Sequence, residues 1–341
     1  MAVHDYVEAA STVVFIASTV INVFFIYIVH TKTKQDIGNY KYVMICFAIG
    51  NIAYSLAEFI SKPTIHIHRN SYMSISKSFI AKWKPWGFLS LCLFNAMYGA
   101  NTAILALHFI YRYLIICRHD WTYLIEKTRY IVMWIALVFF WGFAYGLITL
   151  FCFGPTEQFY NYARGSVLER FNERIEDMSF FCVFIYDIID GVVIMNWLSC
   201  VGLFLIVTMM LCTFTVMAVT GWSMVVTLMR VTMSEKTRML QTQLLKALIF
   251  QAAVPFLLSY LPRFLMFSFV LLGFPSYRVY TFVPVMVTSY TVLDPIAVMY
   301  FIHDYREAVY SLLCCRFQVF KSDVLVASGS SRFSYRYQSS V

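Results

Sequence analysis

Charged side chains are scarce in this sequence. Asp, Glu, Lys and Arg make up 13% of its 341 residues, whereas soluble globular proteins carry about 25%. Hydrophobic residues make up 60% of the chain, and its mean hydropathy is +0.69. So few polar groups cannot cover a water-exposed globule of this size, and so many apolar residues exclude disorder of the whole chain. The composition therefore excludes a soluble enzyme and places most of the chain in lipid.

Motifs for metals and cofactors are missing as well. The sequence contains no Cys-x-x-Cys pair and no His-Glu-x-x-His, the spacings that are typical of zinc sites. The first apolar run lacks a basic segment before it and is too long for a cleavable leader, so we expect it to be retained as a span. We expect no metal, no cofactor, no enzymatic activity and no nucleic-acid partner.

Seven apolar runs are long enough to cross a membrane. A helix rises about 1.5 Å per residue, so a hydrocarbon core about 30 Å thick takes about 20 residues, whereas barrel strands need only about 9–11. The runs are Thr12–Val29, Tyr40–Ile60, Trp86–Cys117, Tyr130–Phe153, Gly191–Leu228, Leu244–Leu272 and Tyr280–Ile302. The sequence thus predicts an all-α membrane protein with a seven-transmembrane-helix bundle over residues 12–303. Residues 1–11 would precede it, and 304–341 would form a tail with an amphipathic helix and a Ser-rich, disordered end.

The distribution of Lys and Arg predicts how the bundle is oriented. Sixteen of the 26 lie on the side of the C-terminus and nine on the opposite side, with Arg263 inside a run. Because cytoplasmic loops carry an excess of these residues, we expect a cytoplasmic C-terminus. An odd number of spans then places the N-terminus outside. In the second outer loop, opposite charges at i,i+4 spacing over Glu169–Asp177 predict a short exposed helix that caps the outer mouth of the bundle.

Two pairs of cysteines stand out among the nine. Cys92 and Cys182 are the two that could form a disulfide on the outer side, and the alternative is two unpaired thiols. The adjacent Cys314 and Cys315 follow the last run by a dozen residues, a common setting for S-palmitoylation. Here the alternative is a pair of ordinary reduced thiols.

Ionisable residues inside lipid are costly, so each is a functional candidate. Glu58 and Arg263 lie near the outer ends of runs two and six; either they extend toward the interface, or both face a ligand cavity. Asp294, which precedes Pro295, lies deeper in run seven, and we expect a polar contact from it to Asn22 or Asn51.

The third run carries polar residues on one helical face. Counting back from Arg112 at about 100° per residue, this face includes His108, Asn101, Tyr98 and Phe94. It should face the interior of the bundle, to bind a ligand or to bond to other helices. No Asp or Glu lies in this run, which disfavours a receptor for amines.

The sixth run contains two prolines, Pro255 and Pro262. Each removes a backbone hydrogen bond and disturbs the preceding turn, so we expect a kinked helix. The kink is either a hinge between an outer binding half and an inner signalling half, or a static feature of packing.

Six segments, in this order, resemble the nematode seven-transmembrane chemoreceptors of the Str class, the group that includes the diacetyl odorant receptor. They are Asn39–Val43, Glu58–Pro63, His108–Tyr113, Thr237–Ala247, Gln251–Pro255, and Asp294–Pro295 with His303–Arg306. The resemblance implies a G-protein-coupled chemosensory (odorant-type) receptor in the plasma membrane, specifically the ciliary membrane of chemosensory neurons. Tyr111 precedes Arg112 where rhodopsin-like receptors have an acid, so an ionic lock of their kind cannot form.

We expect the ligand, a small neutral or apolar molecule, in the outer half of the bundle, with an organic acid bound to Arg263 as the alternative. The candidate ligand-binding residues are Glu58, Phe94, Tyr98, Asn101, Arg263 and Tyr290. The candidate residues for coupling to a heterotrimeric G-protein α-subunit are Arg112, Arg118, Lys236, Arg238 and Lys246. Serines and the terminal Val341 suggest arrestin and PDZ partners for the tail. The competing functions are a ligand-gated cation channel of the insect-odorant-receptor type, with its N-terminus inside, and a small-solute transporter.

Overall fold

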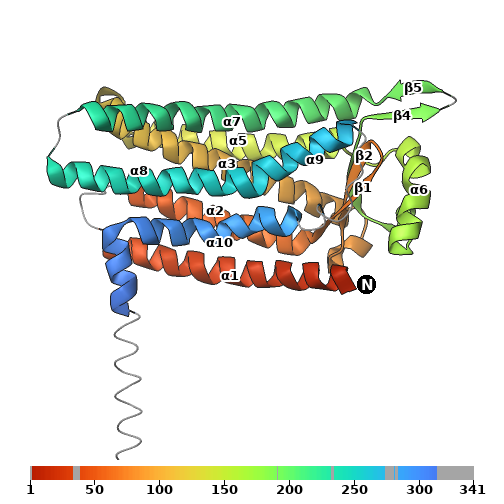
Figure 1. The fold of residues 1–341 in the computed structure, drawn as a ribbon, viewed down its shortest axis with the longest axis horizontal. Helices are drawn as coiled ribbons and strands as arrows, with labels where there is room; N and C mark the ends of the chain where they lie inside the picture. The colour runs from red at the N-terminus through yellow and green to blue at the C-terminus, as the bar shows by residue number, and fades with distance from the viewer. Residues whose placement is uncertain are drawn as a thin grey trace, which may run out of the picture.

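Seven helical segments in the computed structural model are long and apolar enough to cross a membrane. The model describes residues 2–33, 39–189, 191–231, 234–272, 280 and 283–312. The seven segments are α1 (Ala2–Lys32), α2 (Tyr40–Ser61), α3 (Trp86–Cys117), α5 (Thr128–Cys152), α7 (Trp197–Arg230), the interrupted helix α8–α9 (Glu235–Leu272) and α10 (Val283–Phe301). They lie side by side along the long axis of the molecule (Figure 1). The predicted seven-helix bundle is confirmed.

The helices do not end where the apolar runs end. α1 begins at Ala2, so residues 2–11 belong to the first helix and are not a separate segment. α8 begins at Glu235, nine residues before the predicted start of span six, because helical hydrogen bonding continues past the lipid. α7 begins at Trp197, and the predicted start of span five at Gly191 is wrong, because Val192–Met195 form strand β5. A run of apolar residues indicates burial in lipid or protein, not where a helix starts.

A three-stranded antiparallel sheet closes the end of the bundle where the chain begins (Figure 1). Its strands β1 (Pro63–His68), β2 (Ser71–Ser76) and β3 (Phe180–Phe184) follow this order, with Tyr72 opposite Ile67 and Val183. Successive side chains alternate between its faces. Ile65, Ile67, Tyr72, Phe181 and Val183 pack against the bundle. The prediction of an all-α chain missed this sheet. Thr64–His68 does alternate polar and apolar residues, as a strand does, but β2 and β3 lack such a regular alternation.

Helix α6 (Glu157–Phe171) covers the outer face of the sheet. Its N-cap residue Thr156 accepts a hydrogen bond from the backbone N of Phe159 at 3.3 Å. The helix ends at Asn172, which has φ 53°, so the predicted helix over Glu169–Asp177 is largely wrong and only a 3₁₀ turn, η4 (Ile175–Asp177), follows. The charges in this segment bind elsewhere, since Glu173 pairs with Lys77 and Glu176 with Arg164. The outer loops nevertheless cap the bundle, as predicted.

The remaining elements are short. η2 (Phe79–Lys82) precedes α3, and η3 (His119–Trp121) and α4 (Tyr123–Glu126) link α3 to α5. Strands β4 (Tyr186–Ile189) and β5 (Val192–Met195) form a hairpin that projects beyond α7 (Figure 1). After α10 the chain turns into a helix that is described over 303–312, and Tyr305 and Ala308 on its inner side are buried. This helix stands where the amphipathic tail helix was predicted.

Small residues bring α3 and α5 into close contact. A Cβ atom added at Gly142 would lie 2.8 Å from the carbonyl oxygen of Ala96 and 2.9 Å from the Cβ of Ala100. A Cβ atom added at Gly99 would lie 2.5 Å from Cδ2 of Tyr145, so the ring of Tyr145 packs directly against this glycine. Close backbone approach at small residues is the usual way that helices associate in lipid. The α3–α5 pair therefore forms a firm support for the residues that α3 presents to the interior.

We predict that Gly142→Leu lowers the stability of the bundle by about 1–3 kcal/mol, because the new side chain has no space between α3 and α5. The melting temperature of the purified protein in detergent measures this effect. Gly165→Leu is the matched control, because nothing lies within 4 Å of a Cβ added at Gly165 on α6. Equal melting temperatures for the two variants would contradict the packing described here.

Candidate functional site

A small cavity lies in the outer half of the bundle beneath the sheet. Its volume is about 50 Å³. The residues that line it come from β1 to β3, α3, α5, α7, α9 and α10, and most are apolar. They include Phe94, Tyr72, Tyr145, Phe181, Ile206, Phe267 and Arg263. Of the six predicted ligand-binding residues, Phe94 and Arg263 line this cavity.

Arg263 is the cation of this cavity. Its guanidinium carbon lies 3.8 Å from the centroid of the Tyr98 ring, a close cation–π contact. Such contacts are worth about 0.5–2 kcal/mol, more when they are shielded from water. Within the described part of the chain, Arg263 makes no ion pair. Tyr98 is fully buried beneath it, so this predicted residue supports the cavity through Arg263.

Tyr98 also contacts the break in the sixth span. The Ser259 hydroxyl donates a hydrogen bond to the Tyr98 oxygen at 3.2 Å. Next to it, the hydroxyls of Tyr260 and Thr213 lie 3.4 Å apart. Ser259 and Tyr260 are buried and belong to η5 (Phe256–Tyr260), a π-helical turn between α8 and α9. One tyrosine therefore joins the cavity to this turn.

The π turn lies between the two predicted hinge prolines. The backbone N–H of Leu261 bonds to the carbonyl of Phe256, five residues back. Pro255 and Pro262 have no N–H to donate, so regular i→i−4 bonding fails on both sides of the turn. Single π turns are a recognised cause of helix kinks. The predicted interruption of this helix is confirmed, and its role as a hinge stays a prediction.

Glu58 lies apart from the cavity. Both of its carboxylate oxygens accept hydrogen bonds from the Ser11 hydroxyl, at 2.9 and 2.8 Å. A second, smaller pocket contains Glu58 together with Lys62 and Lys77, and Lys62 pairs with Glu8. The interpretation in which Glu58 and Arg263 face each other in one cavity is therefore wrong. Its cause is the hydroxyl of Ser11 on α1, a partner that the apolar pattern of the first run did not reveal.

A chain of polar side chains crosses the middle of the bundle. Asn101 donates to the Asn51 side chain at 2.8 Å and to the Tyr290 hydroxyl at 2.7 Å. Asn51 in turn donates to Asp294 at 3.2 Å, which confirms the predicted contact. Asn22 donates to the carbonyl of Thr291, the residue three positions before Asp294. Neither Asn101 nor Tyr290 lines the cavity, so the two predicted ligand residues belong to this network.

Two of the segments singled out in the sequence, Asn39–Val43 and His108–Tyr113, meet at the cytoplasmic end of α3. The Tyr40 hydroxyl lies 3.1 Å from Nδ1 of His108, whose Nε2 lies 3.0 Å from the carbonyl of Val43. The guanidinium of Arg112 lies 5.1 Å from the centroid of the Tyr40 ring. The whole predicted face of α3, from Phe94 to Arg112, is buried, and its inward orientation is confirmed. His108 and Tyr40 are both buried, and each provides a hydrogen-bond partner for the polar side-chain atom of the other.

Arg112 is buried and does not line an open cleft at the cytoplasmic end of the bundle. Its Nη2 donates a hydrogen bond to the side-chain oxygen of Gln241 on α8, and its Nε has no partner among the described residues. This contact ties α3 to α8 at the cytoplasmic end. The sequence analysis missed Gln241, although Gln241, Leu245, Leu248 and Gln251 recur at the spacing of one helical face.

The other predicted coupling residues surround this end. Arg118, Lys236, Arg238 and Lys246 are all exposed or partly exposed. Arg118 donates from Nε to the Tyr113 hydroxyl at 3.4 Å. Lys246 lies eight residues beyond Arg238 on α8, about 12 Å along the helix axis. The four cations are therefore exposed, one at the end of α3 and three on α8, and their joint role in coupling stays a prediction.

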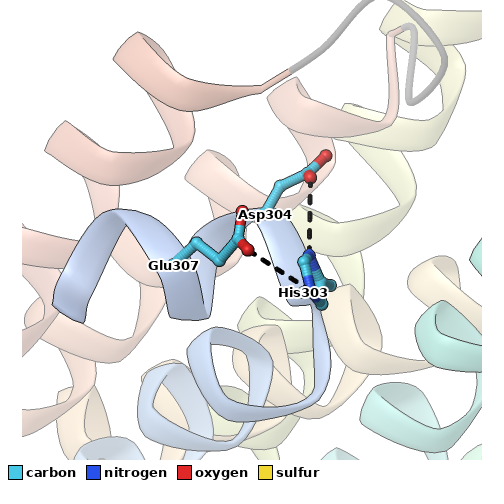
Figure 2. A group of neighbouring side chains, drawn as sticks. All are labelled: His303, Asp304 and Glu307. Atoms are coloured by element: carbon cyan, nitrogen blue, oxygen red, sulfur yellow. Dashed lines mark ion pairs between the residues drawn. The ribbon is translucent and has the colours of Figure 1, made fainter. Parts of the chain in front are cut away.

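The helix over 303–312 begins with a cluster of His303, Asp304 and Glu307 (Figure 2). Nδ1 of His303 lies 4.0 Å from Asp304 and Nε2 lies 3.5 Å from Glu307. Their ligand atoms are close enough together to hold a metal ion, a juxtaposition that the sequence analysis did not anticipate. His303 and Glu307 are exposed, and such surface groups occur in many proteins as ordinary ion pairs.

Comparison with known proteins assigns the chain to a family. Residues 7–310 match the family model described as serpentine type 7TM GPCR chemoreceptor Str. The chain belongs to the Str family of chemoreceptors. Among its Caenorhabditis elegans relatives are serpentine receptor class r-10, 25% identical over 86% of this chain and 87% of that one, and G-protein coupled receptor str-33, 25% identical over 87% and 88%. Squid rhodopsin shares the fold, with a TM-score of 0.58 and 18% identity over 92% of this chain and 83% of that one.

The family assignment decides several predictions. This Str receptor is a multi-pass membrane protein of a receptor family, not of an enzyme family. A G protein and a small-molecule ligand are the partners that membership of this family implies. The cation-channel and transporter alternatives are not supported, because the matching family is one of G-protein-coupled chemoreceptors. Membership of a G-protein-coupled receptor family agrees with the predicted orientation, with the N-terminus extracellular and the C-terminus cytoplasmic.

The two candidate disulfide cysteines are free and buried in this receptor. On β3 the side chains of Phe181 and Val183 point toward the bundle, and that of Cys182 points to the opposite face. Cys182 therefore packs in the cluster beneath α6. Cys92 lies on α3 at the opposite side of the sheet. The disulfide interpretation is therefore wrong, and the alternative of two unpaired thiols holds. The palmitoylation candidates Cys314 and Cys315 lie outside the described residues.

We predict that Cys182 resists alkylation in the native receptor. Burial raises the pKa of its thiol to about 12, and the thiolate is the form that reacts. Mass spectrometry after treatment with N-ethylmaleimide should find Cys182 unlabelled in native protein, labelled after unfolding, and never linked to Cys92. A Gly165→Cys variant supplies the exposed control and should be labelled at once. A peptide that contains Cys92 bonded to Cys182 would contradict the structure.

Proposed function

We propose that this Str receptor binds a small molecule in its outer cavity and activates a heterotrimeric G protein by moving the cytoplasmic end of α8 away from α3. The observation that carries the proposal is the Arg112–Gln241 hydrogen bond, which joins α3 to α8 beyond the π turn. It closes the region where a signalling partner would bind. Besides this contact, Gln243 on α8 accepts a hydrogen bond from the backbone N of His303 at 3.2 Å. A helix that is broken at its midpoint and joined to its neighbours by polar contacts at its inner end is suited to a two-state movement.

The contacts of Tyr98 support a coupling between the cavity and α8. Tyr98 stacks against Arg263 on one side and accepts the Ser259 hydrogen bond of the π turn on the other. A molecule that binds Arg263 changes the surroundings of Tyr98 and thereby the relative free energies of the two packings. It shifts the equilibrium only by its difference in affinity for them, and about 5.5 kcal/mol is needed for a near-complete switch.

Opening would expose Arg112 within a basic surface. Arg118 and Arg238 are exposed at the same end, and with Lys236 and Lys246 they favour the C-terminal helix of a G-protein α-subunit as the occupant of the groove between α3 and α8. The membrane would be that of a chemosensory cilium, where an odorant reaches the outer cavity directly. Arrestin and PDZ proteins are further proposed partners of the tail, most of which lies outside the described residues.

The cavity supports a small ligand. Aromatic and aliphatic side chains form most of its wall, as the sequence predicted for a neutral or apolar odorant. Arg263 offers one strong polar contact. Glu58, Asn101 and Tyr290 do not line the cavity, so we propose Phe94 and Arg263 as its contact residues and Tyr98 as the residue that positions Arg263.

We predict that Gln241→Ala raises signalling in the absence of ligand by roughly tenfold. The variant removes a hydrogen bond to a charged group, worth about 1.5–3 kcal/mol, from the closed packing. The rate of GTPγS binding to co-expressed G protein, normalised to the amount of receptor at the cell surface, measures the change.

Thr242→Ala is the matched control, because the Thr242 hydroxyl bonds only within its own helix, to the carbonyl of Arg238. Its basal signalling should equal that of the wild type. Wild-type basal signalling from Gln241→Ala, at equal surface expression, would show that this contact does not hold the receptor closed.

A further inference from the structure

The charge of Arg263 has no carboxylate partner within the described receptor. Four acids at the outer end have other partners: Glu8 pairs with Lys62, Glu58 accepts from Ser11, Glu173 pairs with Lys77 and Glu176 with Arg164. The segment 273–282, which links the helix of Arg263 to α10, contains neither Asp nor Glu in its sequence. Arg263 is therefore a cation that lines a cavity and whose closest partner is the face of a tyrosine ring.

Tyrosine rings alone do not neutralise a guanidinium. Tyr98 contacts one face of Arg263, and Tyr72 and Tyr145 line the same cavity. These rings offer π electrons and hydroxyls but no full negative charge. In a site of low dielectric, an unpaired charge is far more costly than one that is paired and hydrogen-bonded. The cavity is thus prepared for an anion that the protein itself does not supply.

We propose, on the basis of the function proposed above, that the ligand of this cavity carries a carboxylate that binds Arg263. The planar guanidinium matches a carboxylate through two parallel hydrogen bonds, a geometry that few other small groups can use. Phe94, Phe181, Ile206 and Phe267 form an apolar wall for the rest of the molecule.

The size of the cavity limits this acid. A volume of about 50 Å³ corresponds to roughly three to five water-sized groups. Short-chain carboxylates such as propionate and butyrate are of this size, whereas long fatty acids are not. Of the two alternatives that the sequence left open, a neutral molecule or an organic acid, the structure favours the acid, because a neutral molecule would leave the charge of Arg263 unpaired.

The direct test is binding of sodium propionate and sodium butyrate to the purified full-length receptor in nanodiscs, measured as a shift in melting temperature. Propionamide and butyramide are the neutral probes of matched shape. We expect at least one of the two carboxylates to raise the melting temperature by about 2–4 °C at saturation, and the amides to have no effect.

Three variants locate the binding. Arg263→Met should abolish the shift, and Arg263→Lys, which keeps the charge but loses the planar fork, should weaken affinity about tenfold. Lys82→Met removes an exposed cation from the same end of the molecule and should bind like the wild type. If Arg263→Met does not fold, the loss of affinity in Arg263→Lys relative to Lys82→Met still decides the outcome.

Equal shifts with carboxylates and amides, undiminished binding in the Arg263 variants, or no shift with either carboxylate would each overturn the proposal. None of these results bears on Gln241. The proposed function fails separately, if Gln241→Ala leaves basal signalling unchanged, so the two failures can be told apart.

Discussion

In lipid, a polar side chain has no water to bond, so it must find its partner within the protein. This constraint explains most of the interior of the receptor. Asn101, Asn51 and Asp294 are hydrogen-bonded across three helices, with Oδ1 of Asn101 and Oδ1 of Asp294 left without a partner among the described residues. Tyr40 and His108 bond to each other at the cytoplasmic end. Two arginines are less completely satisfied. Arg112 rests on one hydrogen bond to Gln241, and Arg263 rests on the ring of Tyr98. These two residues lie at opposite ends of the bundle, Arg263 at the proposed ligand cavity and Arg112 at the proposed G-protein site.

The parts between these ends differ in rigidity. Gly142 and Gly99 let α3 and α5 approach closely, which fixes the helix that carries both Tyr98 and Arg112. The sheet and α6 form a buried cap over the cavity. The sixth span, in contrast, is broken by a π turn between Pro255 and Pro262. The helix that we propose to move therefore lies against a closely packed one, and the Tyr98 side chain of that packed helix contacts the π turn.

The sequence predicts the membrane-spanning part of this fold well. Polar groups are costly in lipid, so each span appears in the sequence as a long apolar run with charged residues mainly outside it. The inward face of α3 and the Asp294–Asn51 contact follow from the same argument. The sheet could not be predicted in this way, since β2 pairs with a strand more than a hundred residues later and both faces are covered. The surroundings of Glu58 and Cys182 could not be predicted from the sequence either. Each depends on a partner, Ser11 or the α6 cluster, that only the folded chain brings close.

The central claim is that the cytoplasmic end of α8 leaves α3 when the receptor is activated. The most direct measurement is the distance between spin labels attached through unnatural amino acids at Asp120, just beyond the end of α3, and at Met239 on α8, both exposed in the closed receptor and neither a proposed contact of the G protein. An activating ligand together with nucleotide-free G protein should lengthen this distance and shift its distribution toward a second, more separated population. A single distribution that is the same with and without ligand and G protein would contradict the account.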